Sequence, residues 1–276
     1  MAKQNPLSGP ELLKQHEDNW QTEMGAIFFG ERSVLRGKDI FSEFGNHRWM
    51  EFMVCAVTGK ESKTTARLIE AMWVICSSYP DPRLWNNRVA ALGGTTRTTG
   101  ALAVNAASAV SEATIYGLRT SKGAIALLHR FREKIENGAS LAELVFGELK
   151  QYRSIWGYGR PLASGDERIK PLMAFARSLG CDDGPYVKLA FEIEKCLKDR
   201  KYKYQINISA VVAALMADEG LSDEEFYYLS MLSFIGGILP CYIDAYNHKQ
   251  GTLFPLPTDR LNYIGSVGHR KWSIGI

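Results

Sequence analysis

The sequence predicts an all-α protein built from many helices, with a large and a small domain and one short β-hairpin near its N-terminus. Apolar residues recur at helical spacing through most of the chain after residue 40. Only the stretch AIFFGERSVLRG reads as short strands around a polar turn. The 276 residues, 46% hydrophobic and 23% charged, have the ordinary composition of a globular protein with one large domain and a smaller lobe.

The first segment, residues 1–24, is a polar leader that we expect to be helical in part. Ile27–Phe29 and Ser33–Leu35 follow as two short strands on either side of the turn Gly30-Glu31-Arg32, which Gly37 closes.

Helical spacing accounts for the rest of the chain. It predicts helices over 40–44, 47–57, 65–77, 85–92, 98–117, 123–136, 141–152, 167–179, 185–198, 206–218 and 223–246. Gly93-Gly94 marks a helix end, and Gly138 and Gly180 are predicted stops. Ser140 and Ser222 are predicted N-caps, the second within a capping box that Glu225 completes. Residues 98–117 are nearly all small, which favours a helix in the middle of a bundle or at a subunit interface.

Charge and cysteine content exclude several classes of function. A net charge of +3 predicts no nucleic-acid binding. The five cysteines are scattered along the sequence, and we expect most of them to be small buried residues. An odd number of scattered cysteines favours a reducing, cytoplasmic compartment. The longest apolar stretch, 231–243, falls short of the roughly 20 residues of a membrane span, so we expect no membrane association. No spacing of His, Cys and carboxylates predicts a metal, and His47, His129 and His269 are expected to be ordinary surface or core residues.

Six segments, in order, resemble the citrate synthase superfamily. They are GERSVLRGKDIFSEF, TTARLIEAMWVICSSYPDPRLWNNRVAALGG, YGLRTSKGAIALLHRFREKI, IWGYGRPLASGDERIKPLMAFAR, YQINISAVVAALMADEGL and LSMLSFIGGILPCYIDAYNHKQG. The resemblance covers about residues 25–265, and the length is closer to citryl-CoA lyases and the matching module of ATP-citrate lyase than to full-length citrate synthases.

This resemblance implies a homodimer of all-α subunits. It implies large-domain helices over 25–156, a mobile small domain over 157–220, and a return to the large domain with a tail over 221–276. A small domain that closes over the ligand excludes water, with glycines 157, 159 and 165 as predicted hinges. The implied chemistry makes or breaks a C–C bond between an acyl-CoA and a keto acid, with acyl-CoA as co-substrate and no permanently bound cofactor.

The family's proton-handling residues are replaced in this chain. Ser121 and Arg160 stand where the family's two histidines belong, and Ser209 stands where its aspartate belongs. Ile125 replaces a motif asparagine and Gly237 a family arginine, whereas Arg168 is retained. Losing one positioned acid or base costs a factor of about 10² to 10⁴ in rate, so a retained activity requires other residues.

We expect the arginines to handle carboxylates. Arg160 is a ligand clamp, or alternatively a surface residue on a Gly-rich turn. Arg168 binds a second carboxylate, with Asp166 nearby, or is an ordinary first-turn residue. A cation is mildly unfavourable at the start of a helix, which indicates an anion close to Arg168.

The polar residues have open alternatives as well. Ser121 and Lys122 donate hydrogen bonds to an anion at a helix N-terminus, or Ser121 simply caps the helix. Asn207 and Ser209 line the site or cap a helix. Glu112, a lone carboxylate among small residues, pairs with Arg97 or Arg119, or acts as a relocated base.

Scattered cations are candidates for the CoA phosphates, and the terminal basic cluster GHRKW alternatively stays solvated. The candidate cations are Lys122, Arg153, Lys249, Arg260, Arg270 and Lys271. Trp156 and Tyr158 stack an adenine or pack against the small domain.

Three functions follow as hypotheses. The first is an enzyme of the citrate synthase or citryl-CoA lyase type with a non-standard site of Arg160, Ser121, Ser209 and Glu112, in which Glu112 or Asp166 accepts a proton. The second is an inactive family member that binds a CoA ester or polycarboxylate as a sensor or partner subunit. The third is a structural bundle without a ligand.

Overall fold

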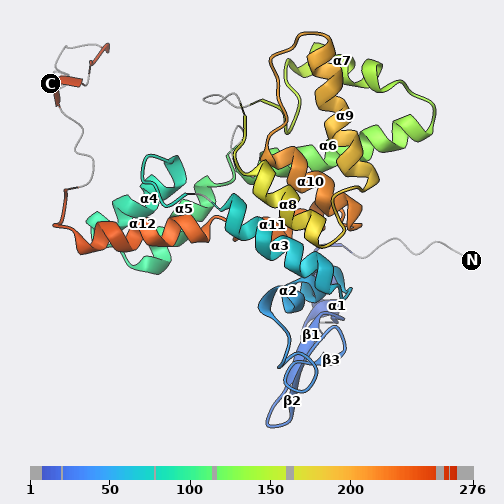
Figure 1. The fold of residues 1–276 in the computed structure, drawn as a ribbon. Coiled ribbons are helices and arrows are strands. Elements are labelled where there is room, and N and C mark those ends of the chain that lie inside the picture. The colour runs from blue at the N-terminus through green and yellow to red at the C-terminus, as the bar shows by residue number, and fades with distance from the viewer. Residues whose placement is uncertain are drawn as a thin grey trace, which may run out of the picture. The chain divides into compact units, whose positions relative to one another are not determined.

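The computed structural model describes residues 8–19, 21–77, 79–113, 117–159, 165–252, 258–260 and 262–265 (Figure 1). The first elements are α1 (Pro10–His16), β1 (Gly25–Phe28), β2 (Arg32–Leu35), β3 (Lys38–Asp39), α2 (Trp49–Thr58), α3 (Lys63–Cys76), α4 (Trp85–Thr95) and α5 (Gly100–Val110). They continue as α6 (Leu118–Glu136), α7 (Leu141–Tyr152), α8 (Ile169–Ser178), α9 (Pro185–Asp199), α10 (Ile208–Asp218), α11 (Asp223–Ser230), α12 (Ile235–Asn247) and the 3₁₀ turn η1 (Thr258–Arg260). The predicted all-α class with a short β-hairpin is confirmed.

The chain divides into two compact units. Unit 1 contains residues 1–77 and 112–233, and unit 2 contains residues 78–111 and 234–276. The predicted small domain, 157–220, lies entirely within unit 1, and its movement as a separate body stays a prediction.

Unit 1 is organised around α10. Every residue of this helix from Ala210 to Ala217 is buried, because the segment is apolar on all sides. Helices α6 and α9 pack on it, with further contacts from α3 and α8 (Figure 1). The helix therefore forms the centre of the hydrophobic core and fixes the position of its own N-terminal residues.

Unit 2 consists of α4, α5 and α12, and its buried core is made almost entirely of small side chains. The buried hydrophobic residues are Ala90, Ala91, Ala103, Ala107, Ile238, Cys241 and Ala245. Gly93 and Gly94 were predicted to mark the end of this helix, but they lie within α4. A Cβ on Gly94 would lie 2.5 Å from the Tyr242 carbonyl oxygen, so these glycines permit close helix packing.

The predicted hairpin is confirmed and has a third strand. β1 pairs antiparallel with β2, with Ala26 opposite Val34, and β2 pairs antiparallel with β3. The helix predicted over 40–44 is wrong: these residues form turns. The Asp39 carboxylate accepts hydrogen bonds from the backbone N–H groups of Phe41 and Ser42, which favours a turn over a helix.

The other predicted helices are present with shifted ends. The predicted helix over 98–117 is shorter, ending at Val110, and the next helix begins at Leu118 instead of residue 123. The helix predicted over 223–246 is two helices, α11 and α12, with turns between them. The Ser222–Glu225 capping box is confirmed, whereas the Ser140 side chain makes no capping hydrogen bond. Gly138 and Gly180 adopt the left-handed conformation predicted for helix stops.

The segment Asp223–Asn247 has the length and mean hydropathy of a membrane span by composition, and 39% of its apolar window is buried. Core helices of water-soluble proteins meet the same criterion. Within this segment the side chains of Phe226 and Leu229 belong to the core of unit 1, and that of Ile238 to the core of unit 2.

All five cysteines are free thiols. Cys55 and Cys241 are buried, as predicted, whereas Cys76, Cys181 and Cys196 are half-buried. Burial raises the pKa of the Cys76 thiol to about 12, so this thiol stays protonated near neutral pH and is a poor nucleophile.

Candidate functional site

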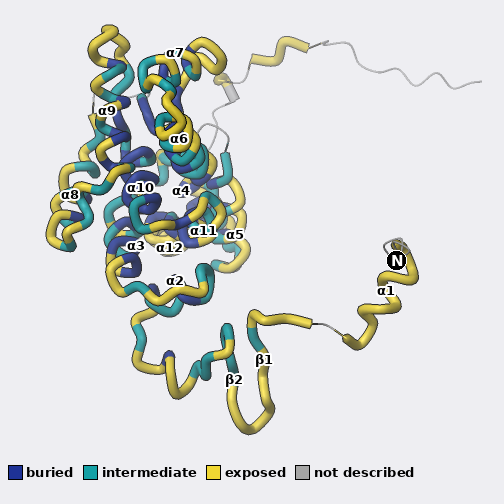
Figure 2. Tube along the Cα trace, turned by 90° about the vertical axis from the view of Figure 1, so that its right-hand side faces the viewer, coloured by how far each residue is buried: buried dark blue, intermediate teal, exposed yellow. Residues whose placement is uncertain are grey.

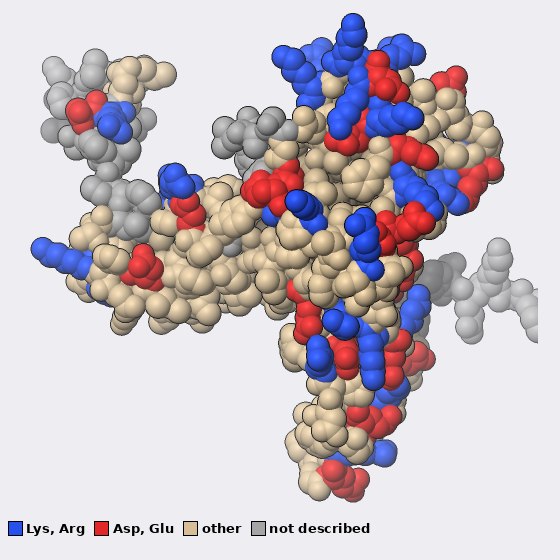
Figure 3. All heavy atoms as spheres, in the orientation of Figure 1, with Lys and Arg blue, Asp and Glu red and all other residues tan. Residues whose placement is uncertain are grey.

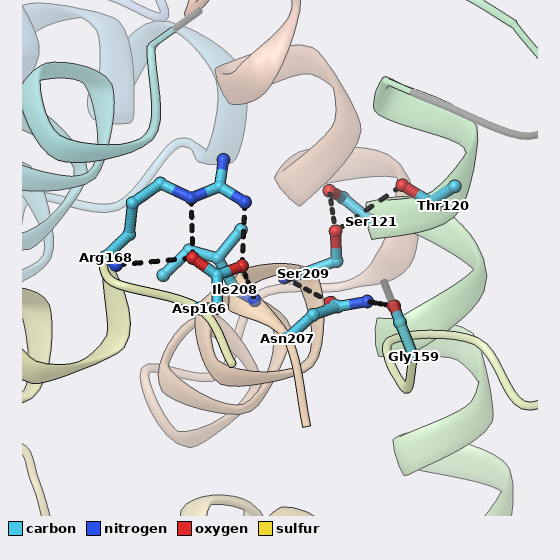
Figure 4. Close-up of polar contacts among 8 residues, drawn as sticks. All are labelled: Thr120, Ser121, Gly159, Asp166, Arg168, Asn207, Ile208 and Ser209. Carbon is cyan, nitrogen blue, oxygen red and sulfur yellow. Dashed lines mark hydrogen bonds and ion pairs between the residues drawn. The ribbon is translucent and has the colours of Figure 1, made fainter. Parts of the chain in front are cut away.

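Three hydroxyl groups meet where α6 and α10 begin. The Ser121 Oγ lies 3.4 Å from the Ser209 Oγ, and the Thr120 Oγ1 lies 3.4 Å from the same atom (Figure 4). Thr120 also donates to the Gly117 carbonyl at 2.7 Å. The partial positive charge at the start of both helices favours an anion or a polarised carbonyl oxygen beside these hydroxyls. We call Thr120, Ser121 and Ser209 the hydroxyl cluster.

The sequence predicted Ser121 and Ser209 for one site, and the structure brings them together. Sequence reasoning missed Thr120, which precedes the predicted helix start at residue 123. Had the helix start been predicted correctly at Leu118, Thr120 would have been placed in the first turn together with Ser121.

Asn207 is the N-cap of α10, one of its two predicted roles. Its Oδ1 accepts the Ser209 backbone N–H at 2.9 Å, and its Nδ2 donates to the Gly159 carbonyl at 2.9 Å. Asn207 therefore fixes the backbone of Ser209 and ties it to the loop before Arg160 (Figure 4).

Asp166 and Arg168 form a pair beside the hydroxyl cluster. The Arg168 Nε and Nη2 donate to the two carboxylate oxygens of Asp166 at 2.8 and 2.7 Å. Asp166 Oδ2 also accepts the backbone N–H of Ile208 at 3.0 Å, so the pair is attached to the start of α10. The anion predicted near Arg168 is this carboxylate, whose side chain is 1% exposed.

Asp166 is not suited to accept a proton. Its burial alone raises the pKa, but the hydrogen bonds and charge of Arg168, with the N–H of Ile208, hold the pKa below its usual value. Asp166 is therefore ionised and fully engaged at neutral pH. This geometry argues against Asp166 as the general base. The role that it supports for Asp166 is to orient the Arg168 guanidinium.

Arg160 lies outside the described residues, so its predicted clamp role is untested. The residues just before it are fixed on α10 and its preceding segment. Tyr158 forms a β-bridge with Ile206, the Gly159 N–H donates to the Gln205 carbonyl at 2.6 Å, and the Asn207 N–H donates to the Gly157 carbonyl at 2.9 Å. The predicted hinge glycines Gly157 and Gly159 have positive φ angles within this hydrogen-bonded arrangement.

Trp156 and Tyr158 were predicted to stack an adenine or to pack against the small domain; Tyr158 contacts the predicted small domain, whereas Trp156 packs on α6. A Cβ on Gly123 would lie 2.6 Å from the Trp156 ring, so the indole lies directly on α6 at the turn that follows Ser121. The buried Tyr158 hydroxyl donates to the Ala190 carbonyl at 2.7 Å. Both aromatic residues hold the loop that leads to Arg160.

Arg97, one of the two cations predicted to pair with Glu112, donates to the carbonyls of Tyr246 and His248 within unit 2. Glu112 instead accepts a hydrogen bond from the Tyr227 hydroxyl at 2.6 Å. This hydrogen bond raises the pKa of Tyr227 above its usual value, so the phenol is protonated and orients the carboxylate.

Lys122 pairs with Glu224 at 2.5 Å and lies over the Tyr227 ring. Its predicted role toward an anion therefore competes with Glu224. Among the other cations, Arg260 is exposed in η1 of unit 2, Arg153 follows α7 in unit 1, and Arg270, Lys271 and His269 fall outside the described residues.

His129 has a structural partner, as predicted. Its Nδ1 lies 2.7 Å from the Asp223 Oδ1, and its ring packs edge-on against Tyr186. The pair borders an open pocket of about 670 Å³ at the start of α11, and no residue of the hydroxyl cluster lines this pocket. In the described ranges, no group of three or more His, Cys, Asp and Glu side chains is placed to hold a metal.

No protein-family model and no curated protein sequence matches the chain. Several solved structures, by contrast, are similar to the structure of this chain. Citryl-CoA lyase from Hydrogenobacter thermophilus superposes with a TM-score of 0.78 at 18% identity, over 92% of this chain and 97% of that one. ATP citrate lyase from Methanothrix soehngenii, solved with citrate and coenzyme A, gives 0.72 at 17% identity, over 96% of this chain and 46% of that one. Citrate synthase from Thermotoga maritima gives 0.61 at 18% identity, over 80% and 59%.

These likenesses show the fold. The chain has the fold of citryl-CoA lyase and citrate synthases, as the sequence resemblance predicted.

Proposed function

We propose that the chain makes or breaks a C–C bond in an acyl-CoA thioester, with a small carboxylated molecule as the other reactant. The observation that carries this proposal is the meeting of Thr120, Ser121 and Ser209 beside the Asp166–Arg168 pair. The fold is shared with a protein named citryl-CoA lyase and with one solved with citrate and coenzyme A.

The hydroxyl cluster suits one part of this chemistry. The Ser121 and Ser209 hydroxyls, at the N-terminal ends of two helices, can turn to donate hydrogen bonds to an oxygen on which negative charge develops, while the Thr120 hydroxyl donates to the Gly117 carbonyl. Arg168, oriented by Asp166, can hold a carboxylate near the same helix start. Arg160 keeps its proposed role as a second clamp.

A reaction of this class also needs a group that accepts a proton. Of the two carboxylates considered from the sequence, Asp166 is engaged by Arg168 and Ile208. Glu112, oriented by Tyr227, is the carboxylate that we assign to this role.

A second function is binding without turnover. It is favoured by one specific observation: Asp166 and Glu112 both accept hydrogen bonds within the chain, so neither is a free base in this structure. A sensor or partner subunit would bind the CoA ester or polycarboxylate and release no thiol.

Calorimetry with acetyl-CoA, citryl-CoA and citrate, together with a colorimetric assay for free-thiol release, separates these functions. Binding with thiol release supports the enzyme, and binding without release supports the second function. No binding of any of the three supports a structural bundle. The double variant Ser121→Ala, Ser209→Ala should lose at least tenfold in thiol release or affinity, whereas Ser154→Ala, an exposed serine in unit 1, should match the unmodified protein.

We also propose that unit 2 forms a homodimer contact through α5 and α12. Leu102 on α5 and Leu239, Ile243 and Tyr246 on α12 are exposed, and α5 carries no charged residue. Figure 3 shows few Lys, Arg, Asp or Glu side chains on the visible face of α12. A core of small side chains buries little apolar area, so a second copy that covers these helices would stabilise unit 2. The cytoplasmic location remains a proposal from the free thiols of the sequence.

A further inference from the structure

The three-stranded sheet at the N-terminus exposes apolar side chains on both of its faces. Ile27 is 67% exposed and Phe29 is 93% exposed, and Met24 and Phe28 are exposed as well. Ile27 and Phe28 point to opposite faces, because successive residues of a strand alternate. Packing on a single face of the sheet therefore cannot cover this surface.

The free edge of β1 is defined by the hydrogen-bond pattern of the sheet. The Arg36 N–H donates to the Met24 carbonyl, so residues 24, 26 and 28 direct their backbone polar groups toward β2. Gly25 and Ile27, which alternate with them, direct their N–H and C=O groups away from β2. No strand of the described residues pairs with that edge, and Figure 2 shows β1 as an outer, largely exposed strand.

Nothing in the sequence of this edge protects it from pairing. Residues 24–30 read Met-Gly-Ala-Ile-Phe-Phe-Gly, with no charge and no proline. Exposed edge strands are usually protected by lysine, proline or a bulge, because an unprotected apolar edge pairs with another strand.

We propose that β1 pairs antiparallel with β1 of a second copy of this chain, joining two three-stranded sheets into one of six strands. The edge is self-complementary: an uncharged strand placed antiparallel to itself puts no like charges opposite each other. This contact is separate from the one proposed for unit 2 and does not depend on the proposed activity.

Overlap of the two strands fixes the register. With Ala26 on the two-fold axis, Gly25 lies opposite Ile27 of the second copy, and Met24 lies opposite its Phe28, so the whole of β1 is paired. With Ile27 on the axis, Gly25 would lie opposite Phe29, which belongs to the turn that follows β1. With Gly25 on the axis, Ile27 and Phe28 would lie opposite Glu23 and Thr22, which precede β1. We therefore infer that Ala26 faces its own counterpart.

Ala26 of each copy then occupies a position without hydrogen bonds between the strands, where the Cα atoms are about 4.5 Å apart. That distance is compatible with a disulfide, which needs about 4.4–6.8 Å. Under mild oxidation, the variant Ala26→Cys should give a covalent dimer on a non-reducing gel that dithiothreitol removes. The matched variant Ser33→Cys, on β2 of the same sheet, should not, because a second copy cannot approach it.

A backbone test removes the donor at the same edge. Ile27→Pro deletes an N–H that points away from β2, so the hairpin should persist by circular dichroism while the mass by light scattering falls twofold. Ile27→Val keeps the donor and should retain the mass of the unmodified protein.

The proposal is wrong if Ala26→Cys folds but forms no covalent dimer, if Ser33→Cys forms it equally, or if Ile27→Pro leaves the mass unchanged. An unchanged mass with a lowered melting temperature would indicate that another part of the same chain covers the edge. CoA-ester binding by Ile27→Pro, measured in parallel, should equal that of the unmodified protein, so failure here is distinct from failure of the proposed function.

Discussion

At the scale of single residues, the Asp166–Arg168 pair has the largest consequence for stability. A carboxylate that is 1% exposed holds both a guanidinium and the first N–H of α10, whereas the Lys188–Asp183 pair is exposed. Removing one member of a buried pair costs about 3–5 kcal/mol, because the other charge is left uncompensated. Exposed pairs contribute about 0–1 kcal/mol.

We therefore expect Asp166→Asn to lower the free energy of unfolding by about 3 kcal/mol, the lower end of that range because Arg168 is partly exposed. Asp183→Asn should change the free energy of unfolding by less than about 1 kcal/mol. Urea denaturation of both variants measures the difference. Equal losses would contradict a special role of the buried pair.

The same pair predicts a pH dependence. Arg168 and Ile208 hold the pKa of Asp166 below its usual value, against the effect of burial. The ionised carboxylate therefore stabilises the fold fully above the pKa of the unfolded chain, about 3.9, and this contribution is lost as pH falls through the lower folded value.

The difference in unfolding free energy between the unmodified protein and Asp166→Asn should accordingly be constant from pH 7 to about 5 and shrink below about 4. Urea denaturation at several pH values measures it. A difference that persists unchanged at pH 2.5 would show that the charge of Asp166 is not the cause.

Tyr227 tests the assignment of Glu112. The hydrogen bond to Glu112 is the main cause of the raised pKa of this phenol. In Glu112→Gln the acceptor loses its charge, so the Tyr227 pKa should fall toward its usual value of about 10.

Tyrosinate absorbance, measured as the difference between each protein and its Tyr227→Phe counterpart, isolates this titration from the other tyrosines. Glu143→Gln, an exposed carboxylate on α7, is the matched control and should not move the Tyr227 curve. An unchanged Tyr227 titration in Glu112→Gln would mean that the two side chains are not joined in solution.

At this scale the sequence predicted that certain side chains lie together, but it did not predict which residues form hydrogen bonds with them. The replaced family positions led to Ser121 and Ser209, which do lie together. The partner of Glu112 was predicted among cations, since a carboxylate among small residues requires compensation. The observed partner is a neutral phenol 115 positions away in sequence, and no local spacing signals such a contact.

At the scale of elements, glycine has two opposite roles within helices. Gly123 in α6 lies under the Trp156 ring, whereas Gly147 in α7 has no atom within 4 Å of an added Cβ. Helical spacing predicted both helices, but it placed the start of α6 at residue 123, whereas the helix begins at Leu118. The reason for Gly123 is packing with a residue 33 positions later, which a local pattern cannot reveal.

Gly123→Ala should therefore destabilise the protein by about 1–3 kcal/mol, the cost of overpacking, and shift tryptophan fluorescence as Trp156 is displaced. Gly147→Ala should stabilise by about 0.5–1 kcal/mol, because alanine is the better helix former. Thermal and urea denaturation distinguish the two signs. A stabilised Gly123→Ala would contradict the close packing of Trp156 on α6.

At the scale of the whole molecule, the two compact units differ in the size of the side chains that form their hydrophobic cores, and therefore in the stability that each core provides. Unit 1 buries large side chains around α10, and its helices were predicted from spacing. The small-residue helix predicted over 98–117 for the middle of a bundle or a subunit interface is α5, which packs on α4 and α12 but buries only Ala103 and Ala107. The buried hydrophobic residues of unit 2 are mainly alanines, while large apolar side chains stay exposed. Burial of about 25 cal/mol per Å² of apolar surface makes such a core weak on its own.

If a second copy covers α12, the stability of unit 2 depends on association. Ile243→Lys, on the exposed face of α12, should then reduce the molecular mass by light scattering and weaken the rise of melting temperature with protein concentration, since binding of a partner stabilises the folded state by mass action. Val74→Lys places the same charge on a residue of α3 that is 80% exposed in unit 1, and should leave both properties unchanged.

Combined with Ile27→Pro at the edge of β1, Ile243→Lys should give a monomer, whereas each change alone leaves one of the two contacts intact. A dimer that persists in the combined variant would require a third contact between copies and would contradict the view that these two apolar surfaces account for assembly.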